Sequence, residues 1–502
     1  MNLTNKTFNG LKWSTLASVL SALMQIGYTA LMARLLDPKA FGLVAMAGVF
    51  LRFATYFSNM GMGQAIIQKT DLSKNDIKAA FTSSLLLGGF FGIIIWLTAP
   101  LGGLLFDSEN VVPIIKVLSL AFVFSGLSIT SDSLLKRKMN FKSTSFIEIG
   151  SYVLGFGGVG VISALNGLGV WSLVFANLSR SFFTAVFSYA LVRHPLSISF
   201  KLENYKKLFG YGSKISVISF FEFIGQSLDT LIIGRIKGAN LLGTYNRALT
   251  VGQLPMTYIS DSLAKVLFPA FSSIQSNVKR LKQSFLSSIS LASYILIPIG
   301  IGMSFASEEI ILTVLGPQWT DSIPLFEILA FAIPIKFLSK FSGILMDSTA
   351  RLKGKLIFQI IWVIGLLGAF LLIKNEELIY FTYVLLGFLF IRNIFYLLLV
   401  QKILHFSAKE IISAHFPAIL TGLVIGLLIT LLKLLLEPLA LNVIIELIIL
   451  VVFAAISWFS MIFIKPNSSV RIEILNKLNK IDFFRNSALY KYLLKNMSYI
   501  SR

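Results

Sequence analysis

Four arginines lie inside segments that are otherwise apolar, and they are the side chains with the most chemical meaning in this chain: Arg52, Arg180, Arg247 and Arg392. An arginine near the centre of a bilayer costs at least about 2.5 kcal/mol on insertion scales. That cost implies either a paired carboxylate or an aqueous cavity that accepts anions. The planar guanidinium suits a phosphate group well. Arg52, Arg180 and Arg247 are therefore candidate anion ligands, and an internal salt bridge is the alternative for each.

A polar stripe follows one face of the first apolar segment, and a second stripe follows a later one. Their members are Ser14, Ser18, Ser21 and Gln25 in the first, and Ser219, Glu222, Gln226 and Asp229 in the second. Polar groups that face lipid are costly, so both stripes should face protein or water. For the serines, hydrogen bonding between helices is the favoured interpretation. Acids within a span are candidates for function, so Glu222 and Asp229 are predicted to bind a coupling cation.

The two stripes belong to an internal repeat with an offset of 201 residues. Its identical pairs are Gln25 and Gln226, Thr29 and Thr230, Arg34 and Arg235, and Gly42 and Gly243. A duplicated membrane unit is typical of transporter folds. The paired glutamines are candidates for the substrate cavity. Arg34 and Arg235 are weaker cavity candidates, because an arginine at a helix end more often snorkels or caps carbonyl groups.

The sequence does not contain the residues that several kinds of chemistry require. The chain has no cysteine, and its three histidines are scattered at 194, 405 and 415. No phosphate-binding glycine loop and no H-E-x-x-H pair is present, so neither direct ATP drive nor a catalytic metal is expected. We expect no cofactor, no metal and no enzymatic activity.

The composition is that of a helical membrane protein. The 502 residues are 56% apolar and 13% charged, and the mean hydropathy is +0.80. Apolar runs long enough to cross about 30 Å of hydrocarbon recur along the chain, which favours helices over a β-barrel. The pattern predicts fourteen helices, near 10–33, 41–61, 79–104, 111–133, 144–164, 168–192, 212–234, 241–264, 284–306, 321–342, 354–373, 378–400, 411–433 and 441–464.

The positive charge predicts orientation. With the N-terminus inside, 31 lysines and arginines fall on inner segments and tails, whereas seven fall on outer segments. This asymmetry predicts that both termini are cytoplasmic. It also explains the net charge of +21 without a nucleic-acid partner.

The repeat predicts the domain organisation. Six helices span the offset, so the two copies share one orientation and the repeat axis lies along the membrane normal. Residues 1–192 form an N-lobe and 212–400 a C-lobe, followed by two further helices at 401–464. A basic amphipathic linker at 193–211 is predicted to lie in the inner interface, and the basic tail at 465–502 either lies on the inner leaflet or is a solvated helix.

The segment ARLLDPKAFGLVAMAGVF from Ala33, followed by FSNMGMGQAIIQ from Phe57, resembles the opening of polysaccharide flippases. These are similar to exporters of O-antigen, colanic acid and teichuronic acid in the multidrug/oligosaccharidyl-lipid/polysaccharide superfamily. The resemblance implies two six-helix lobes around a central cationic cavity in a bacterial cytoplasmic membrane. It also implies a substrate, an oligosaccharide linked to undecaprenyl diphosphate, which crosses the membrane by alternating access.

Several further expectations accompany this resemblance. Membrane lipids are expected partners, and a polysaccharide polymerase and glycosyltransferases are candidate partners. A proton or Na⁺ gradient is a candidate driving force, because a cation can bias an equilibrium only by binding its two states unequally. Two alternatives remain open: a multidrug or cation antiporter of the same superfamily, and a scaffold for envelope polysaccharide assembly. A basic cavity would favour the flippase, an acidic cavity the antiporter, and a dry core the scaffold.

Overall fold

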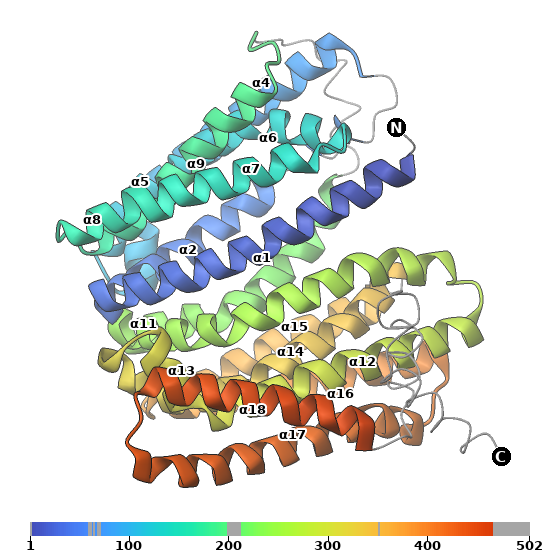
Figure 1. Ribbon diagram of the computed structural model, residues 1–502. Coiled ribbons are helices and arrows are strands. Elements are labelled where there is room, and N and C mark those ends of the chain that lie inside the picture. Colours follow the sequence, from blue (N-terminus) through green and yellow to red (C-terminus); the bar gives the residue numbers. More distant parts are fainter. Residues whose placement is uncertain are drawn as a thin grey trace. The chain divides into compact units, whose positions relative to one another are not determined.

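The computed structural model describes residues 3–58, 63, 66–67, 72–197, 212–349 and 352–464. Side chains are described within 16–55, 63, 66–67, 72–197, 223–257, 267–349 and 353–461. The predicted amphipathic linker lies mostly outside these residues, and the C-terminal tail lies wholly outside them. Within the described residues every regular element is a helix (Figure 1).

Twelve helical segments among the described residues are long and apolar enough to cross a membrane. Helices with this composition confirm the prediction of an all-α, multi-pass membrane protein. The two remaining predicted helices, at 212–234 and 241–264, coincide with α11 (Gly212–Ser273). Gly238 interrupts α11 with φ of 77°, a left-handed conformation that glycine adopts without strain. The count of fourteen spans stays a prediction.

The first elements are α1 (Leu3–Leu35), α2 (Pro38–Ser58) and α4 (Lys74–Phe106). The carboxylate of Asp37 accepts a hydrogen bond from the Ala40 amide at 2.9 Å, which caps the start of α2. Ser73 and Asp76 form a capping box at the start of α4. These caps explain why the apolar runs begin as helices at these residues.

The predicted helix at 111–133 is two elements, α5 (Val111–Leu118) and α6 (Ala121–Arg137). The glycine-rich helix that follows also departs from regular geometry. It comprises α7 (Phe141–Tyr152), a π-helix η1 (Val153–Gly160) and α8 (Val161–Leu165). A Cβ atom at Gly155 would lie 2.6 Å from the backbone nitrogen of Arg180 in α9 (Val170–Leu191). Glycine at this position therefore lets two helix backbones approach closely.

The later elements begin with α12 (Val278–Phe305), α13 (Ser307–Val314) and the 3₁₀ helix η2 (Pro317–Ser322). Helices α14 (Ile323–Ser348), α15 (Leu352–Leu372) and α16 (Leu378–Leu404) follow. The last two long helices are α17 (Ala408–Leu436) and α18 (Val443–Ile464), joined through η3 (Glu437–Leu439). Figure 1 shows α17 and α18 running beside each other, and both belong to the same compact unit.

The chain forms two compact units. The first contains residues 1–247, 314–319 and 359–378, and the second contains 248–313, 320–358 and 379–502. The first unit thus joins the predicted N-lobe to the first helix of the predicted C-lobe and to most of the predicted helix at 354–373, and it holds Arg52, Arg180 and Arg247. The assignment of the lobes as 1–192 and 212–400 stays a prediction.

Candidate functional site

The repeated glycines lie where the two copies of the motif meet within the first unit. A Cβ atom at Gly42 would lie 1.7 Å from the carbonyl oxygen of Ala239. A Cβ atom at Gly243 would lie 1.7 Å from the carbonyl oxygen of Pro38. Since Pro38 and Ala239 are also 201 residues apart, the two contacts are the same contact made in both directions. Such reciprocity is expected of a two-fold relation between repeats.

The repeated arginines each bind the end of another helix. Arg34 Nη1 donates to the carbonyl of Val314, the last residue of α13, at 3.0 Å. Arg235 Nη1 donates to the carbonyl of Leu104 in the last turn of α4 at 2.8 Å, and it lies 3.6 Å from a carboxylate oxygen of Asp107. A cation at a helix C-terminus is favoured by the free carbonyl groups there. These contacts agree with the carbonyl-capping role predicted for both arginines.

Two other arginines pack against aromatic rings that the sequence analysis did not name. The guanidinium of Arg180 lies 5.7 Å from the ring centroid of Tyr152 and 5.6 Å from that of Phe156. The guanidinium of Arg247 lies 4.5 Å from the ring centroid of Phe41. Cation–π contacts are worth about 0.5–2 kcal/mol, more where water is excluded. They hold the guanidinium planes in position, and Arg247 Nη2 also donates to Asn246 Oδ1 at 3.0 Å.

Tyr28 on α1 connects these two arginines. Its ring lies 4.8 Å from the ring of Phe156 and 6.3 Å from that of Tyr152. It also lies close enough to Arg247 for an electrostatic interaction. We name Tyr28, Tyr152, Phe156, Arg180 and Arg247 the arginine–aromatic cluster. It is a candidate anion site, because Arg180 packs on two of its rings and Arg247 interacts with the third.

A carboxylate lies on the same face of α7 as the cluster. Glu148 is one helical turn before Tyr152, and its Oε1 accepts a hydrogen bond from Ser21 of α1 at 3.4 Å. The side chain is exposed, whereas Ser21 is buried. Sequence analysis missed Glu148, although the spacing of Glu148, Tyr152 and Phe156 at i, i+4 and i+8 could have shown the shared face.

The predicted acid Asp229 is buried with neutral partners. Its Oδ2 accepts from the hydroxyl of Tyr245 at 2.7 Å, and its Oδ1 accepts from the amide of Thr230 at 2.7 Å. Tyr245 is fully buried. The hydroxyl of Tyr245 and the amide of Thr230 therefore hold this carboxylate. The side chain of Glu222, the other predicted acid, lies outside the described residues.

The remaining candidates differ in exposure. Arg52 on α2 and Gln226 on α11 are exposed, and Gln25 on α1 is half-buried. Arg34 and Arg235 occupy helix ends, whereas Arg180 and Arg247 share the aromatic cluster. Arg180 of α9 packs on Tyr152 and Phe156, and Arg247 of α11 interacts with Tyr28, whose ring contacts Phe156.

Comparison with known proteins points to one family. A family model described as polysaccharide biosynthesis protein matches residues 31–324. The lipopolysaccharide biosynthesis protein WzxC of Escherichia coli K12 is 26% identical over 353 residues, covering 70% of this chain and 72% of that protein. The teichuronic acid biosynthesis protein TuaB of Bacillus subtilis is 22% identical, covering 73% of this chain and 75% of that protein.

Two solved structures share the fold. The lipid II flippase MurJ in an inward closed conformation superposes with a TM-score of 0.70 at 13% identity, covering 90% of this chain and 98% of that structure. An inward-facing multidrug resistance transporter of the MATE family superposes with a TM-score of 0.58 at 14% identity, covering 78% of this chain and all of that structure. At these identities the likeness shows the fold.

Proposed function

Since the chain belongs to the polysaccharide biosynthesis protein family, we propose that it is a flippase for lipid-linked oligosaccharide, of the multidrug/oligosaccharidyl-lipid/polysaccharide superfamily. The substrate we propose is an oligosaccharide joined to undecaprenyl diphosphate. The protein moves it from the inner to the outer leaflet of a bacterial cytoplasmic membrane. Relatives named for lipopolysaccharide and teichuronic acid biosynthesis support this assignment.

The single observation that carries the proposal is the arginine–aromatic cluster. A diphosphate brings two or more negative charges into a low-dielectric site, where unpaired charge is very costly. Arg180 and Arg247 compensate that charge with N–H groups held in position by the aromatic rings. A binding site for cationic drugs would need the opposite charge, so the cluster supports the flippase over a cation antiporter.

The proposed cycle is alternating access. The diphosphate and the first sugars enter the cavity while the polyprenyl chain stays in lipid. Bound diphosphate contacts the cluster arginines and so stabilises the conformation that closes around it. We propose that the sugars and phosphates contact Gln25, Gln226 and Arg52 as they cross the cavity.

We further propose that Glu148 links transport to a proton or Na⁺ gradient. Its exposed carboxylate can exchange a cation, whereas Asp229 is enclosed by Tyr245 and the backbone. Glu222 remains a second proposed coupling residue. A polysaccharide polymerase and glycosyltransferases are proposed partners, because they consume and supply such a substrate.

The test measures the rate at which proteoliposomes containing wild-type protein or an Arg247 variant transport a fluorescent polyprenyl-diphosphate oligosaccharide. Arg247→Lys keeps the charge but loses the bidentate fork, so partial transport is expected. Arg247→Ala should lower the initial rate at least tenfold, since a charge-assisted hydrogen bond is worth about 1.5–3 kcal/mol.

Arg137→Lys is the matched control for this test. Arg137 donates to the carbonyl oxygens of Ile66 and Ile67 and lies outside the cluster. Its conservative replacement should leave the transport rate near that of the wild type. Unchanged transport by folded Arg247→Ala would remove the cluster from the substrate path.

A further inference from the structure

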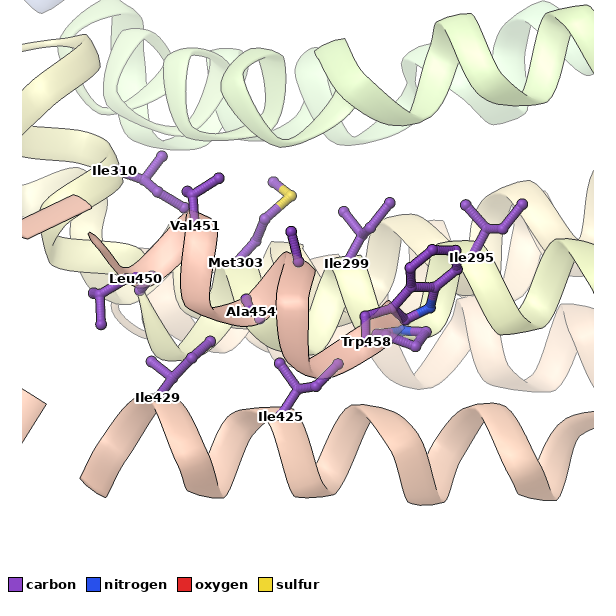
Figure 2. A pocket seen from close by; sticks show the side chains of 14 residues that line it. Ile295, Ile299, Met303, Ile310, Ile425, Ile429, Leu450, Val451, Ala454 and Trp458 are labelled. Atoms are coloured by element: carbon purple, nitrogen blue, oxygen red, sulfur yellow. The ribbon is translucent and has the colours of Figure 1, made fainter. Parts of the chain in front are cut away.

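An elongated apolar pocket lies within the second unit between α12, α17 and α18. Figure 2 shows Ile299 and Met303 of α12, Ile425 and Ile429 of α17, and Val451 of α18 pointing into it. Its volume is about 410 Å³. That value lies within the usual range of ligand pockets, about 300–1,000 Å³. Only apolar side chains line its length, which suits a hydrocarbon chain.

The two ends of the pocket differ. At one end Trp458 donates from its indole nitrogen to the carbonyl of Tyr294 at 3.0 Å, which orders the ring there. At the other end Lys433 pairs with Glu309 at 2.6 Å. Glu309 immediately precedes Ile310, and Lys433 lies one turn beyond Ile429, so this ion pair borders the lining of the pocket.

Further acids gather at this polar end. Glu446 lies one turn before Leu450, another lining residue, and it interacts electrostatically with Glu308, Glu309 and Lys433. Three carboxylates and one ammonium group therefore lie near this end, and only Glu309 is paired with Lys433. An anionic headgroup would be repelled by this balance, whereas a headgroup that carries a positive charge would be attracted.

One carboxylate oxygen at this end has no partner. Glu309 is 3% exposed, and its Oε2 is buried without a hydrogen bond among the described residues. Leaving a buried charged acceptor unsatisfied is costly, by about 1–3 kcal/mol or more. A donor from outside the chain would remove that cost. An N–H donor with positive charge fits both the unsatisfied oxygen and the excess of acids.

We propose that this pocket is a site for phosphatidylethanolamine. One acyl chain fills the apolar length, and the primary ammonium group donates to Glu309 Oε2. The lipid phosphate meets Lys433, whose ammonium has three donors and is 30% exposed. This role goes beyond the transport function proposed above and does not depend on the identity of the transported glycan.

The test measures which lipid stays bound to the purified full-length protein by native mass spectrometry. The delipidated protein is incubated with equal amounts of phosphatidylethanolamine, phosphatidylcholine and phosphatidylglycerol with identical acyl chains. We expect one retained phosphatidylethanolamine, favoured about tenfold over phosphatidylcholine, whose quaternary ammonium cannot donate. Phosphatidylglycerol should be retained least.

Three variants distinguish recognition of the lipid headgroup from binding of its acyl chain. Glu309→Gln removes the charged acceptor and should bring the retention of the two zwitterionic lipids within about twofold. Ala455→Phe narrows the pocket from the exposed side of α18 without a charge change and should reduce retention of every lipid. Glu376→Gln, an exposed acid outside the pocket, should match the wild type.

Two results would overturn the proposal. Equal retention of phosphatidylethanolamine and phosphatidylcholine by the wild type would show that the headgroup is not recognised. Displacement of phosphatidylethanolamine by an equal amount of polyprenyl phosphate would assign the pocket to an isoprenoid chain. Because Ala455→Phe leaves the ion pair intact, the test stands even if Glu309→Gln fails to fold.

Discussion

Glu148 and Asp229 are two carboxylates of the first unit in contrasting settings. Glu148 is exposed and accepts one hydrogen bond of 3.4 Å from a serine, whereas Asp229 is buried and accepts a 2.7 Å bond from a tyrosine. Exchange of a cation needs access, and a structural acceptor needs burial. At the scale of single residues, exposure therefore distinguishes Glu148, the proposed coupling acid, from Asp229, one of the two acids that the sequence analysis favoured.

Replacing the two acids should have different consequences. Glu148→Gln should remove the response of the transport rate to a pH or Na⁺ gradient while the protein melts near the wild-type temperature. Asp229→Asn weakens the charged hydrogen bond from Tyr245, so a loss of about 1.5–3 kcal/mol of stability is expected. Transport under imposed gradients and thermal unfolding in detergent measure the two effects. A gradient response that survives in Glu148→Gln would move the coupling role to another residue.

His194, after the end of α9, predicts a pH effect on stability. The imidazole is 5% exposed and packs against Phe81 and Tyr189, with ring centroids 5.1 and 5.5 Å away. Burial lowers the pKa of His194 below its usual value of about 6.5. Below a pH of about 6.5 the unfolded chain therefore binds a proton at this histidine more readily than the folded protein does. The free energy of unfolding falls as the pH drops below about 6.5.

His194→Leu should flatten this dependence. Unfolding of the wild type and the variant between pH 7.5 and 5.5 measures it, with the exposed His405→Asn as the control. An identical slope in the wild type and His194→Leu would place the titrating group elsewhere.

At the scale of elements, the start of α2 packs directly against the backbone of residues 239–243 in α11, and the two segments are copies of the same repeat. Glycine occupies both positions of this reciprocal contact because any Cβ atom would overlap a carbonyl oxygen. The contact, together with the carbonyls held by Arg34 and Arg235, ties α2, α4, α11 and α13 at their ends. In the proposed alternating-access cycle, we expect this contact to separate in the opposite state.

Gly42→Leu should separate these two segments. Overpacking typically lowers stability by about 1–3 kcal/mol, and a backbone carbonyl can move aside less easily than a side chain. The chain has no cysteine, so a disulfide between Lys39→Cys and Asn240→Cys can report the contact directly. We expect cross-linking in the parent and much less in Gly42→Leu.

The control for this experiment is Gly27→Leu, since a Cβ atom at Gly27 meets nothing within 4 Å. Cross-linking should be retained in that variant. Equal cross-linking in both leucine variants would mean that the glycine contact does not hold the segments together.

For the whole molecule, the distribution of basic residues predicts that both termini are cytoplasmic. Reporter fusions at Arg502 and in the 107–112 loop should therefore report opposite sides of the membrane. Opposite sides require an odd number of spans between the two sites, and the predicted topology places eleven spans there. The same side for both fusions would contradict the predicted fourteen-helix topology.

The spans could be predicted from sequence because hydropathy is a local property of consecutive residues. Apolar runs such as those of α15 and α17 are long enough to cross a bilayer whatever surrounds them. The repeat of Gln25, Arg34 and Gly42 was also visible, since identity at a fixed offset needs no structure. The resemblance around Ala33 also pointed to polysaccharide flippases, and the model of the polysaccharide biosynthesis protein family matches residues 31–324.

Tertiary structure decided which polar groups act together. No local pattern shows that Arg180 and Arg247 share an aromatic surface with Tyr28, because the rings come from helices far apart in the sequence. Likewise, the partner of Asp229 is a tyrosine sixteen residues away, beyond the kink at Gly238. The energy of a buried charge depends on what surrounds it in space, and packing between helices determines those surroundings.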